Sequence, residues 1–306
     1  MKTSLKGFRG FLVVVFGAAL LLLPVPAGGQ TSVENAIKQF GETNIKGYMQ
    51  PLADMFGANM NAGYYHSAAM PQTGFGFSFD IVAMGAMVGD DQKNYTAVAP
   101  AGFNPGTFTT ATIFGEKGTE IKNVNFPSST YRGADGVFNT SIFPTAVPQI
   151  RIGYLAGTEA LLRFVVVPRI GEDVLPKSTL WAAGVRHSIS QYLSGAPLDI
   201  AAGVYYSKFT AGDLIDFTGT NVSVQASKSF SVLSLYGGVA WQKSTLNLKY
   251  TTTDPAQPGA VDVSLDGSNT FSATLGAGLT LGFFHIFADA NFGSVTHFSG
   301  GIGFGN

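Results

Sequence analysis

The 306-residue sequence contains no cysteine, few charged residues, and no long apolar run beyond its first thirty residues. Without cysteine the chain has neither a disulfide framework nor an N-terminal cysteine for lipid attachment. Charged residues make up 12% of the chain, which is about half the usual share in soluble domains. A spanning helix needs about 20 apolar residues. These absences exclude a disulfide-stapled domain and a helical membrane protein, and they argue against an ordinary soluble globule.

The first residues have the layout of a secretory signal. Lys2, Lys6 and Arg9 precede a 13-residue apolar run at 11–23, and Ala27 follows a proline pair as the expected cleavage point. We therefore predict a signal peptide over 1–27. Its removal takes three of the 18 basic residues and leaves 15 Lys and Arg against 19 Asp and Glu, a net charge of −4. That balance argues against nucleic acid as a partner, which would require a basic surface.

Glycine and phenylalanine are abundant, at 39 and 25 residues. A chain with many aromatics and few charges suits a surface that faces lipid. An exported apolar chain without spanning helices can cross a bilayer only as a closed β-barrel, because every backbone group must be hydrogen-bonded within the protein. The composition therefore predicts a bacterial outer-membrane barrel.

Residues 28–57 show helical periodicity. Apolar residues recur at mostly three- and four-residue steps, which places them on one helix face: Val33, Ile37, Phe40, Tyr48, Leu52 and Phe56. Pro51 is expected to divide the helix. This segment is either a periplasmic cap on the barrel or a plug inside it. One apolar stripe does not distinguish the two, and the cap is the simpler interpretation.

From residue 58 to 306 the period changes to two, which is typical of strands. In 271–282 one face carries Phe271, Leu275 and Leu279, and the other carries only small or polar residues. The pattern predicts an all-β antiparallel transmembrane barrel of about twelve strands, at 59–69, 74–88, 146–156, 158–169, 177–191, 197–210, 213–227, 229–243, 244–254, 260–282, 283–293 and 295–305. Alternation lapses in 89–145, which is either a long irregular loop or extra strands. Fourteen strands therefore remain an alternative.

The polar face of the strands is expected to line the lumen, since an Arg or Lys that faces lipid at mid-depth costs about 2–4 kcal/mol. Arg151 and Arg163 are expected to share a patch, because a turn at 156–158 joins their strands. The charges either pair across the interior and support the barrel, or select solutes by charge. The predicted lumen-facing residues are Asp80, Arg151, Arg163, Arg169, Asp199, Lys249 and Asp289.

Histidine spacing gives no catalytic or metal motif. His66, His187, His285 and His297 lack the paired spacing of a zinc site. His187 and Ser188 are neighbours on a predicted strand, so they point to opposite faces and cannot form a catalytic dyad. We therefore expect no enzyme activity, no metal and no cofactor.

Several short stretches resemble an uncharacterised bacterial outer-membrane family known as a domain of unknown function. The resemblance covers most of the mature chain and implies a barrel without assigning an activity. It rests on Tyr48-Met49-Gln50-Pro51-Leu52, Phe56-Gly57-Ala58-Asn59, Gly63-Tyr64-Tyr65-His66, Thr112-Ile113-Phe114-Gly115, Pro148-Gln149-Ile150, Gly157-Thr158-Glu159, 184–192 and 197–201. In architecture alone the chain is also similar to outer-membrane transporters of long-chain fatty acids and aromatic hydrocarbons, which have helical N-terminal plugs.

The sequence thus favours a porin-like or hydrophobic-solute channel in the outer membrane. One alternative is a closed structural or adhesion-type barrel that acts through its surface loops. Another is a soluble periplasmic β-protein that binds lipid inside. The expected partners are outer-membrane lipid, small or apolar solutes and the barrel-assembly machinery.

Overall fold

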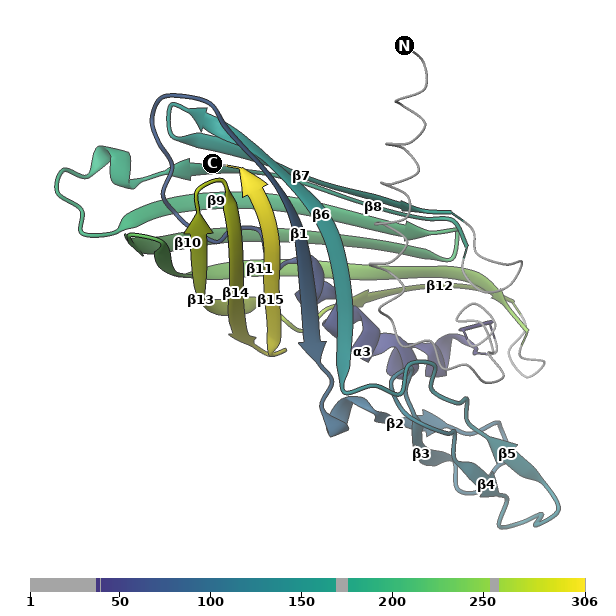
Figure 1. Ribbon diagram of the computed structural model, residues 1–306. Helices are drawn as coiled ribbons and strands as arrows, with labels where there is room; N and C mark the ends of the chain where they lie inside the picture. The colour runs from purple at the N-terminus through teal and green to yellow at the C-terminus, as the bar shows by residue number, and fades with distance from the viewer. Residues whose placement is uncertain (1–36, 39, 169–175, 254–258, 306) are drawn as a thin grey trace.

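The computed structural model describes residues 37–38, 40–168, 176–253 and 259–305. Ten antiparallel strands close into a barrel (Figure 1), because β1 pairs with both β6 and β15, and β10 pairs with both β9 and β11. The predicted signal peptide at 1–27 lies outside the described residues. The barrel strands are β1 (Gly76–Met87), β6 (Ile142–Leu155), β7 (Thr158–Val167), β8 (Ser178–Ser188), β9 (Asp199–Ala211), β10 (Ile215–Phe230), β11 (Leu233–Thr252), β13 (Phe271–Leu281), β14 (Phe284–Gly293) and β15 (His297–Gly305).

The prediction of twelve or fourteen barrel strands is wrong, for three reasons. Residues 59–69 form no strand and follow a helix into the interior. Residues 229–254 contain the one long strand β11 in place of two, since its alternation continues without a turn. Residues 260–282 contain two strands, β12 (Gly259–Asp266) and β13, and β12 pairs only with the far half of β11, outside the closed ring.

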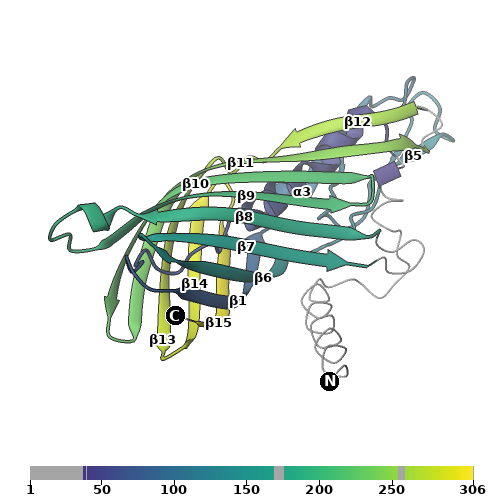
Figure 2. The same ribbon diagram turned by 90° about the horizontal axis from the view of Figure 1, so that it is seen from above.

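The two ends of the barrel differ (Figure 2). One end, here called the short-turn end, carries the turns at 156–157, 231–232 and 282–283, the last described residues of β15, and one longer connection at 189–198 that contains η2 (Ser190–Tyr192). The opposite end, here called the loop end, carries residues 88–141 between β1 and β6. This segment forms a small outer domain in place of barrel strands. It contains η1 (Asp90–Gln92) and two hairpins, β2 (Asn94–Val98) with β3 (Thr107–Ala111) and β4 (Glu120–Lys122) with β5 (Thr130–Arg132).

Helix α3 (Glu42–Met60) begins at the loop end and runs into the barrel. Its buried residues Tyr48, Leu52 and Met55 pack with the apolar inner side of β11 and β12 in one core. Pro51 lies within the helix and does not divide it into two. Among the described residues, no helix is long and apolar enough to span a bilayer.

The outer domain is attached to this helix by hydrogen bonds. Asn44 Nδ2 donates to Val98 O at 2.9 Å and its Oδ1 accepts from Val98 N at 2.9 Å. The Tyr48 hydroxyl donates to Asp135 O at 2.9 Å. Burial raises the pKa of Tyr48, so the hydroxyl keeps the proton that it donates. The helix, the outer domain and the far half of β11 therefore form one unit at the loop end.

In strands β9, β10 and β11, the side chains that face the interior change from mostly polar to mostly apolar partway along the strand. The change occurs near Ser207, Gly219 and Ser244, which are register partners across the three strands. Toward the short-turn end, β11 exposes Leu235, Val239 and Trp241 and buries Ser234 and Gln242. Toward the loop end, it buries Leu246, Leu248 and Tyr250, while Lys249 is exposed. We call the line through Ser207, Gly219 and Ser244 the inversion line.

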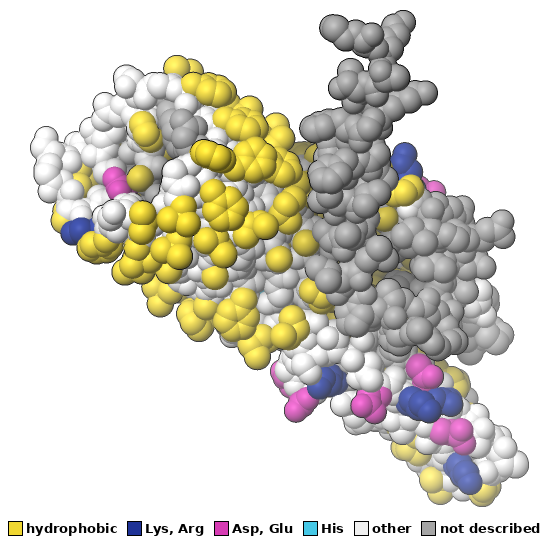
Figure 3. Space-filling view, viewed as in Figure 1, with side chains coloured by type: hydrophobic (Ala, Val, Ile, Leu, Met, Phe, Trp, Pro, Cys, Tyr) yellow, Lys and Arg dark blue, Asp and Glu magenta, His cyan; other side chains and the backbone are white. Residues whose placement is uncertain are grey.

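Between the short-turn end and this line, apolar side chains cover most of the outer wall on the face that Figure 3 shows. The apolar side chains of the wall are partly or largely solvent-exposed, and come from all around the ring: Phe77, Ile152, Leu162, Phe164, Val185, Val204, Val222, Val224, Val239, Leu275, Leu279, Ile286, Phe292, Phe298, Ile302 and Phe304. Charged groups gather instead on the outer domain. Monomeric soluble proteins rarely expose an apolar surface of this extent.

Candidate functional site in the barrel interior

Residues 61–70, here called the inner segment, continue from α3 through the interior. At Gly63 the backbone has φ +68°, and an added Cβ would lie 2.6 Å from Val82 Cγ1 of β1. The same position is close to Arg163 of β7 and Ser299 of β15. A left-handed residue this close to three strands favours glycine. The wall thus encircles the inner segment.

Three arginines on the neighbouring strands β6, β7 and β8 reach this segment from one side of the wall. Arg151, Arg163 and Arg186 are 5%, 3% and 3% exposed, respectively. Each donates to a group in residues 62–67. Arg151 and Arg163 lie two residue pairs apart in register, because Gln149 is opposite Arg163 and Arg151 is opposite Leu161. Their expected shared patch therefore exists, and Arg186 extends it.

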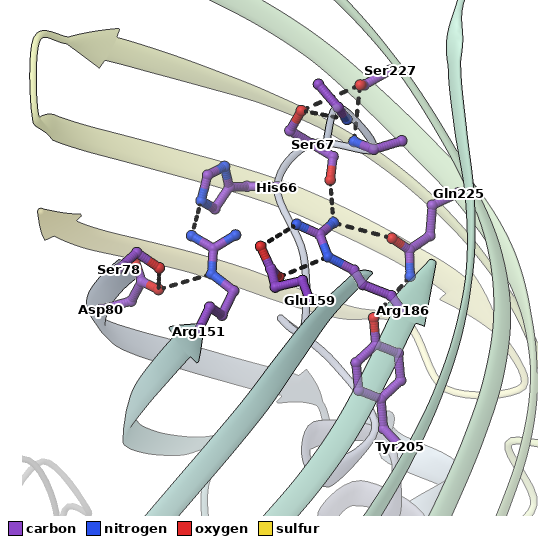
Figure 4. A network of polar contacts seen from close by, with 12 residues as sticks. His66, Ser67, Ser78, Asp80, Arg151, Glu159, Arg186, Tyr205, Gln225 and Ser227 are labelled. Carbon is purple, nitrogen blue, oxygen red and sulfur yellow. Dashed lines mark hydrogen bonds and ion pairs between the residues drawn. The ribbon is translucent and has the colours of Figure 1, made fainter. Parts of the chain in front are cut away.

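Arg186 makes the most complete set of contacts (Figure 4). Its Nε and Nη2 donate to the two carboxylate oxygens of Glu159 at 2.8 and 3.1 Å. Its Nη1 donates to Gln225 Oε1 at 3.3 Å and to the Ser67 carbonyl. Ser67 Oγ lies 3.3 Å from Ser227 Oγ, and Ala68 N donates to the same Ser227 oxygen at 2.9 Å. At this point the inner segment is thus bound to β8 and β10 by polar contacts, and Ala68 and Met70 pack against Ala201 of β9.

Among the residues that the structure describes, Arg163 has no carboxylate partner. Its Nε donates to Gln149 Oε1 at 2.9 Å, and its Nη2 donates to Ala62 O at 2.8 Å. The guanidinium also lies 4.2 Å from the ring centroid of Tyr64, which stacks on Tyr205 at 4.2 Å. A planar guanidinium suits such a stacked position. The interior therefore holds the inner segment by its aromatic side chain as well as its backbone.

Asp80 and Asp289 follow the arginines around the ring, on β1, which is the neighbour of β6, and on β14. Asp80 is fully buried and accepts from Arg151 Nε at 3.3 Å, Ser78 Oγ at 3.3 Å and His285 Nε2. Asp289 accepts from Tyr236 Oη at 2.9 Å, Asn291 Nδ2 at 2.6 Å and Ser299 Oγ. Both carboxylates are satisfied by side chains of the wall, as buried charges require.

Two of the predicted interior charges lie elsewhere. Lys249 is on the outer face and pairs with Asp262 at 3.0 Å, with both side chains about two-thirds exposed (65% and 68%). The expected inward position is wrong because the alternation gives two faces without saying which is inside, and here the apolar face covers α3. Asp199 is half-buried at the rim of the short-turn end. Arg169 lies outside the described residues.

Sequence patterns missed Glu159, Arg186 and the histidine pair of the interior. Glu159 and Arg186 fell in strands whose alternation is blurred by small residues such as Ala182 and Gly184. His66 and His285 are 219 residues apart, and their rings come within 4.7 Å through the course of the inner segment. An unpaired buried charge is costly, so the rule that buried charges occur in pairs could have linked Glu159 with Arg186. No local pattern predicts the histidine contact.

The interior is closed along the inner segment. The wall side chains Asp80, Gln149, Gln225 and His297 have no solvent-exposed surface. One cavity of about 10 Å³ touches Asn61 and Asn221, whose Oδ1 atoms have no hydrogen-bond partner in the described part of the chain. That space suits about one water molecule. A wider hollow of about 300 Å³ at the short-turn end touches Ser188, Leu193 and Asp199.

A family model matches residues 1–306, described as a family of unknown function (DUF6588). The chain belongs to that family. No curated protein matches the chain. The family description assigns no activity, so the interior geometry carries the argument about function.

Distant likenesses to solved outer-membrane barrels also exist. A loop-deletion mutant of OmpT and in-vitro folded OmpT, both of Vibrio cholerae, are 9% and 10% identical, with TM-scores of 0.28 and 0.29 over 76% of this chain and 100% of each OmpT chain. A porin mutant of Rh. blastica is 9% identical, with a TM-score of 0.17 over 76% of this chain and 99% of that one. Scores this low carry no argument about fold or function.

Proposed function

We propose that the protein is an outer-membrane β-barrel that forms a closed channel, with the inner segment (residues 61–70) as its gate. The observation that carries the proposal is the polar contact between the inner segment and three buried arginines. A permanently closed barrel gains more from an apolar core, because a buried ion pair is often no more stabilising than well-packed hydrophobic residues. Polar contacts can be exchanged for water when the segment moves.

The outer surface supports a bilayer position. The part of β11 from Leu233 to Trp241 has nine residues, close to the roughly 9–11 that a tilted strand uses to cross the hydrocarbon. Trp181, Tyr206 and Trp241 lie on the outer face beside the inversion line, and the first two rings are 5.4 Å apart. Aromatic side chains are enriched at membrane interfaces. We therefore place one edge of the bilayer at the inversion line.

The orientation follows from the two ends. Outer-membrane barrels have short periplasmic turns and longer external loops. On that rule the short-turn end faces the periplasm, and the loop end, with residues 88–141 and the first turn of α3, faces outward. The inner segment then runs from the outside toward the periplasm before β1 begins.

The chemistry of the wall favours polar solutes over apolar compounds. If the inner segment moved, Arg151, Arg163 and Arg186 would line one side of the path, and Asp80 would lie beside them on β1. A charged lining selects by solute charge and offers no apolar surface to a lipid. The proposal includes no catalytic role.

The outer domain supports a second candidate, a closed barrel that displays residues 88–141 to a binding partner. Val124 and Phe126 of that domain are 67% and 65% exposed. The third possibility, a soluble lipid-binding protein, has less support, because a large apolar surface lies on the outside of the barrel, and the interior is filled by the inner segment and α3.

A reversible crosslink tests the gate. The chain has no cysteine, so Ser67→Cys with Ser227→Cys introduces a single pair at a site where the two Oγ atoms lie 3.3 Å apart. We expect conductance steps in planar bilayers for the reduced pair, silent traces after oxidation, and recovery with reductant. The matched control is Ser67→Cys alone, which should not respond to oxidation. Identical conductance steps in both redox states would contradict the gate. Silent traces in both redox states would favour the display candidate.

A further inference from the structure

Three metal-ligating side chains meet in the interior although they are far apart in the sequence. His66 of the inner segment, Asp80 of β1 and His285 of β14 each present one ligand atom, and these atoms lie within 4.8 Å of one another. It is the one such group among the residues that the structure describes. Tetrahedral zinc with bonds of about 2.0–2.2 Å needs donors roughly 3.4 Å apart. Small rotations of the three side chains would therefore bring their ligand atoms to that spacing.

The surroundings exclude bulk water, and a glycine keeps the position beside the three ligand atoms free of a side chain. On β15, a Cβ at Gly303 would lie 2.2 Å from Asp80 Oδ1 and 2.8 Å from His285 Nε2, so any larger residue would fill this position. Phe287 stacks on the His66 ring, with the two centroids 4.8 Å apart. Asp80 is fully buried and His285 is 5% exposed. A dry site of two imidazoles and one carboxylate suits zinc and similar divalent transition metals.

The hydrogen bonds show which nitrogen atoms are available. Arg151 Nη2 contacts His66 Nε2, and a guanidinium only donates, so that nitrogen accepts and carries no proton. His285 Nε2 contacts an oxygen of Asp80, so it carries a proton that must leave when a metal binds. One imidazole is thus ready to ligate, and the other is held by the carboxylate that would become its co-ligand.

Arg151 is the competitor of a metal at this position. Its guanidinium contacts both His66 and Asp80, and it supplies the positive charge that the carboxylate needs. A divalent ion would replace those contacts and repel the guanidinium. Glu159 of β7, which is paired with Arg186 of β8, is near enough to influence Arg151 electrostatically.

We propose that His66, Asp80 and His285 form a binding site for a divalent transition metal such as Zn²⁺, in exchange for Arg151. Because His66 belongs to the inner segment and the other two ligands belong to the wall, a bound ion crosslinks the segment to β1 and β14. The effect of the metal on gating rests on the proposed function, whereas metal binding itself does not.

Equilibrium binding of Zn²⁺ to the chelator-treated full-length mature protein tests the site. We expect one ion per chain, measured by titration calorimetry in detergent. His66→Ala and His285→Ala should each weaken binding by at least about tenfold, since even an outer-shell partner is worth about 10–100-fold. His187→Ala is the matched control, because His187 lies at the short-turn end with Thr158 and Tyr192, and it should bind as the wild type does.

Arg151→Gln distinguishes a metal site from a cluster that only supports the fold. Removing the competing guanidinium should tighten Zn²⁺ binding, while the same change in an inert cluster alters nothing. Heat-modified gel mobility of each variant verifies that the barrel has folded, and His66→Ala changes no strand residue. No saturable binding of Zn²⁺, or binding that survives both His66→Ala and His285→Ala, would overturn the proposal. Binding without any change in conductance would contradict only the gating consequence.

Discussion

The pair between Arg186 and Glu159 allows a quantitative test of the polar interior. Both side chains are buried, at 3% and 6% exposure, and two hydrogen bonds join them. Replacing Arg186 by Met leaves the Glu159 carboxylate without its partner. Removing one member of a buried pair costs about 3–5 kcal/mol. We expect that loss in the free energy of unfolding, together with looser attachment of Ser67.

The reverse change should cost less. In Glu159→Gln, Arg186 keeps its contacts to Gln225 and to the Ser67 carbonyl, and the new amide can still accept from it. The double variant carries no buried charge from this pair. It should therefore be at least about 2 kcal/mol more stable than the sum of the two single losses predicts, which is a coupling typical of contacting residues.

Urea titration of the protein in lipid vesicles measures all four members of this cycle. Lys249→Met is the matched control, because its exposed pair with Asp262 should contribute less than about 1 kcal/mol. An Arg186→Met variant as stable as the control, or losses that simply add in the double variant, would refute the view that the interior charges are mutually compensating.

Three further results are expected. Leu275 lies on the outer wall and is 67% exposed, so Leu275→Arg should lower the free energy of unfolding in vesicles by about 2–4 kcal/mol. Asn247→Arg, beyond the inversion line, should change it by less than about 0.5 kcal/mol. Equal losses for the two variants would contradict the bilayer position. Thr43→Cys should react with a large impermeant maleimide in intact cells, and Ser194→Cys only after the outer membrane is opened; the opposite order would reverse the orientation. Gly63→Ala should loosen the inner segment, since its Cβ would meet Val82, and should raise the frequency of conductance steps; unchanged traces would argue against the gate.

The alternation of side chains predicted the barrel wall well where one face meets the solvent or lipid and the other a polar interior. In β13 the large apolar residues that the pattern placed on one face, Phe271, Leu275 and Leu279, are all exposed. The same reasoning placed Asp80, Arg151, Arg163 and Asp289 in the interior, where they lie.

The pattern failed beyond the inversion line, for a physical reason. There the interior is filled by the apolar face of α3, so Leu246 and Leu248 turn inward and Lys249 turns outward. Period-two alternation is identical in both cases, and only the tertiary contact decides between them. The strand predicted at 59–69 does not form, because the backbone of the inner segment bonds to side chains of the wall and not to the backbone of another strand. The contacts of His66 and Arg186 depend on how that segment passes through the ring, which no local pattern encodes.

The depth of the two tryptophans tests the central claim, that the ring between the short-turn end and the inversion line spans a bilayer, most directly. The protein has only Trp181 and Trp241, and both lie on the outer face at that line. In vesicles of brominated lipids, their fluorescence should be quenched most by bromines close to the headgroups. A reference with both tryptophans replaced by Phe and Leu275→Trp added should be quenched most by bromines near the chain ends. Tryptophans that no brominated lipid quenches would contradict the membrane barrel.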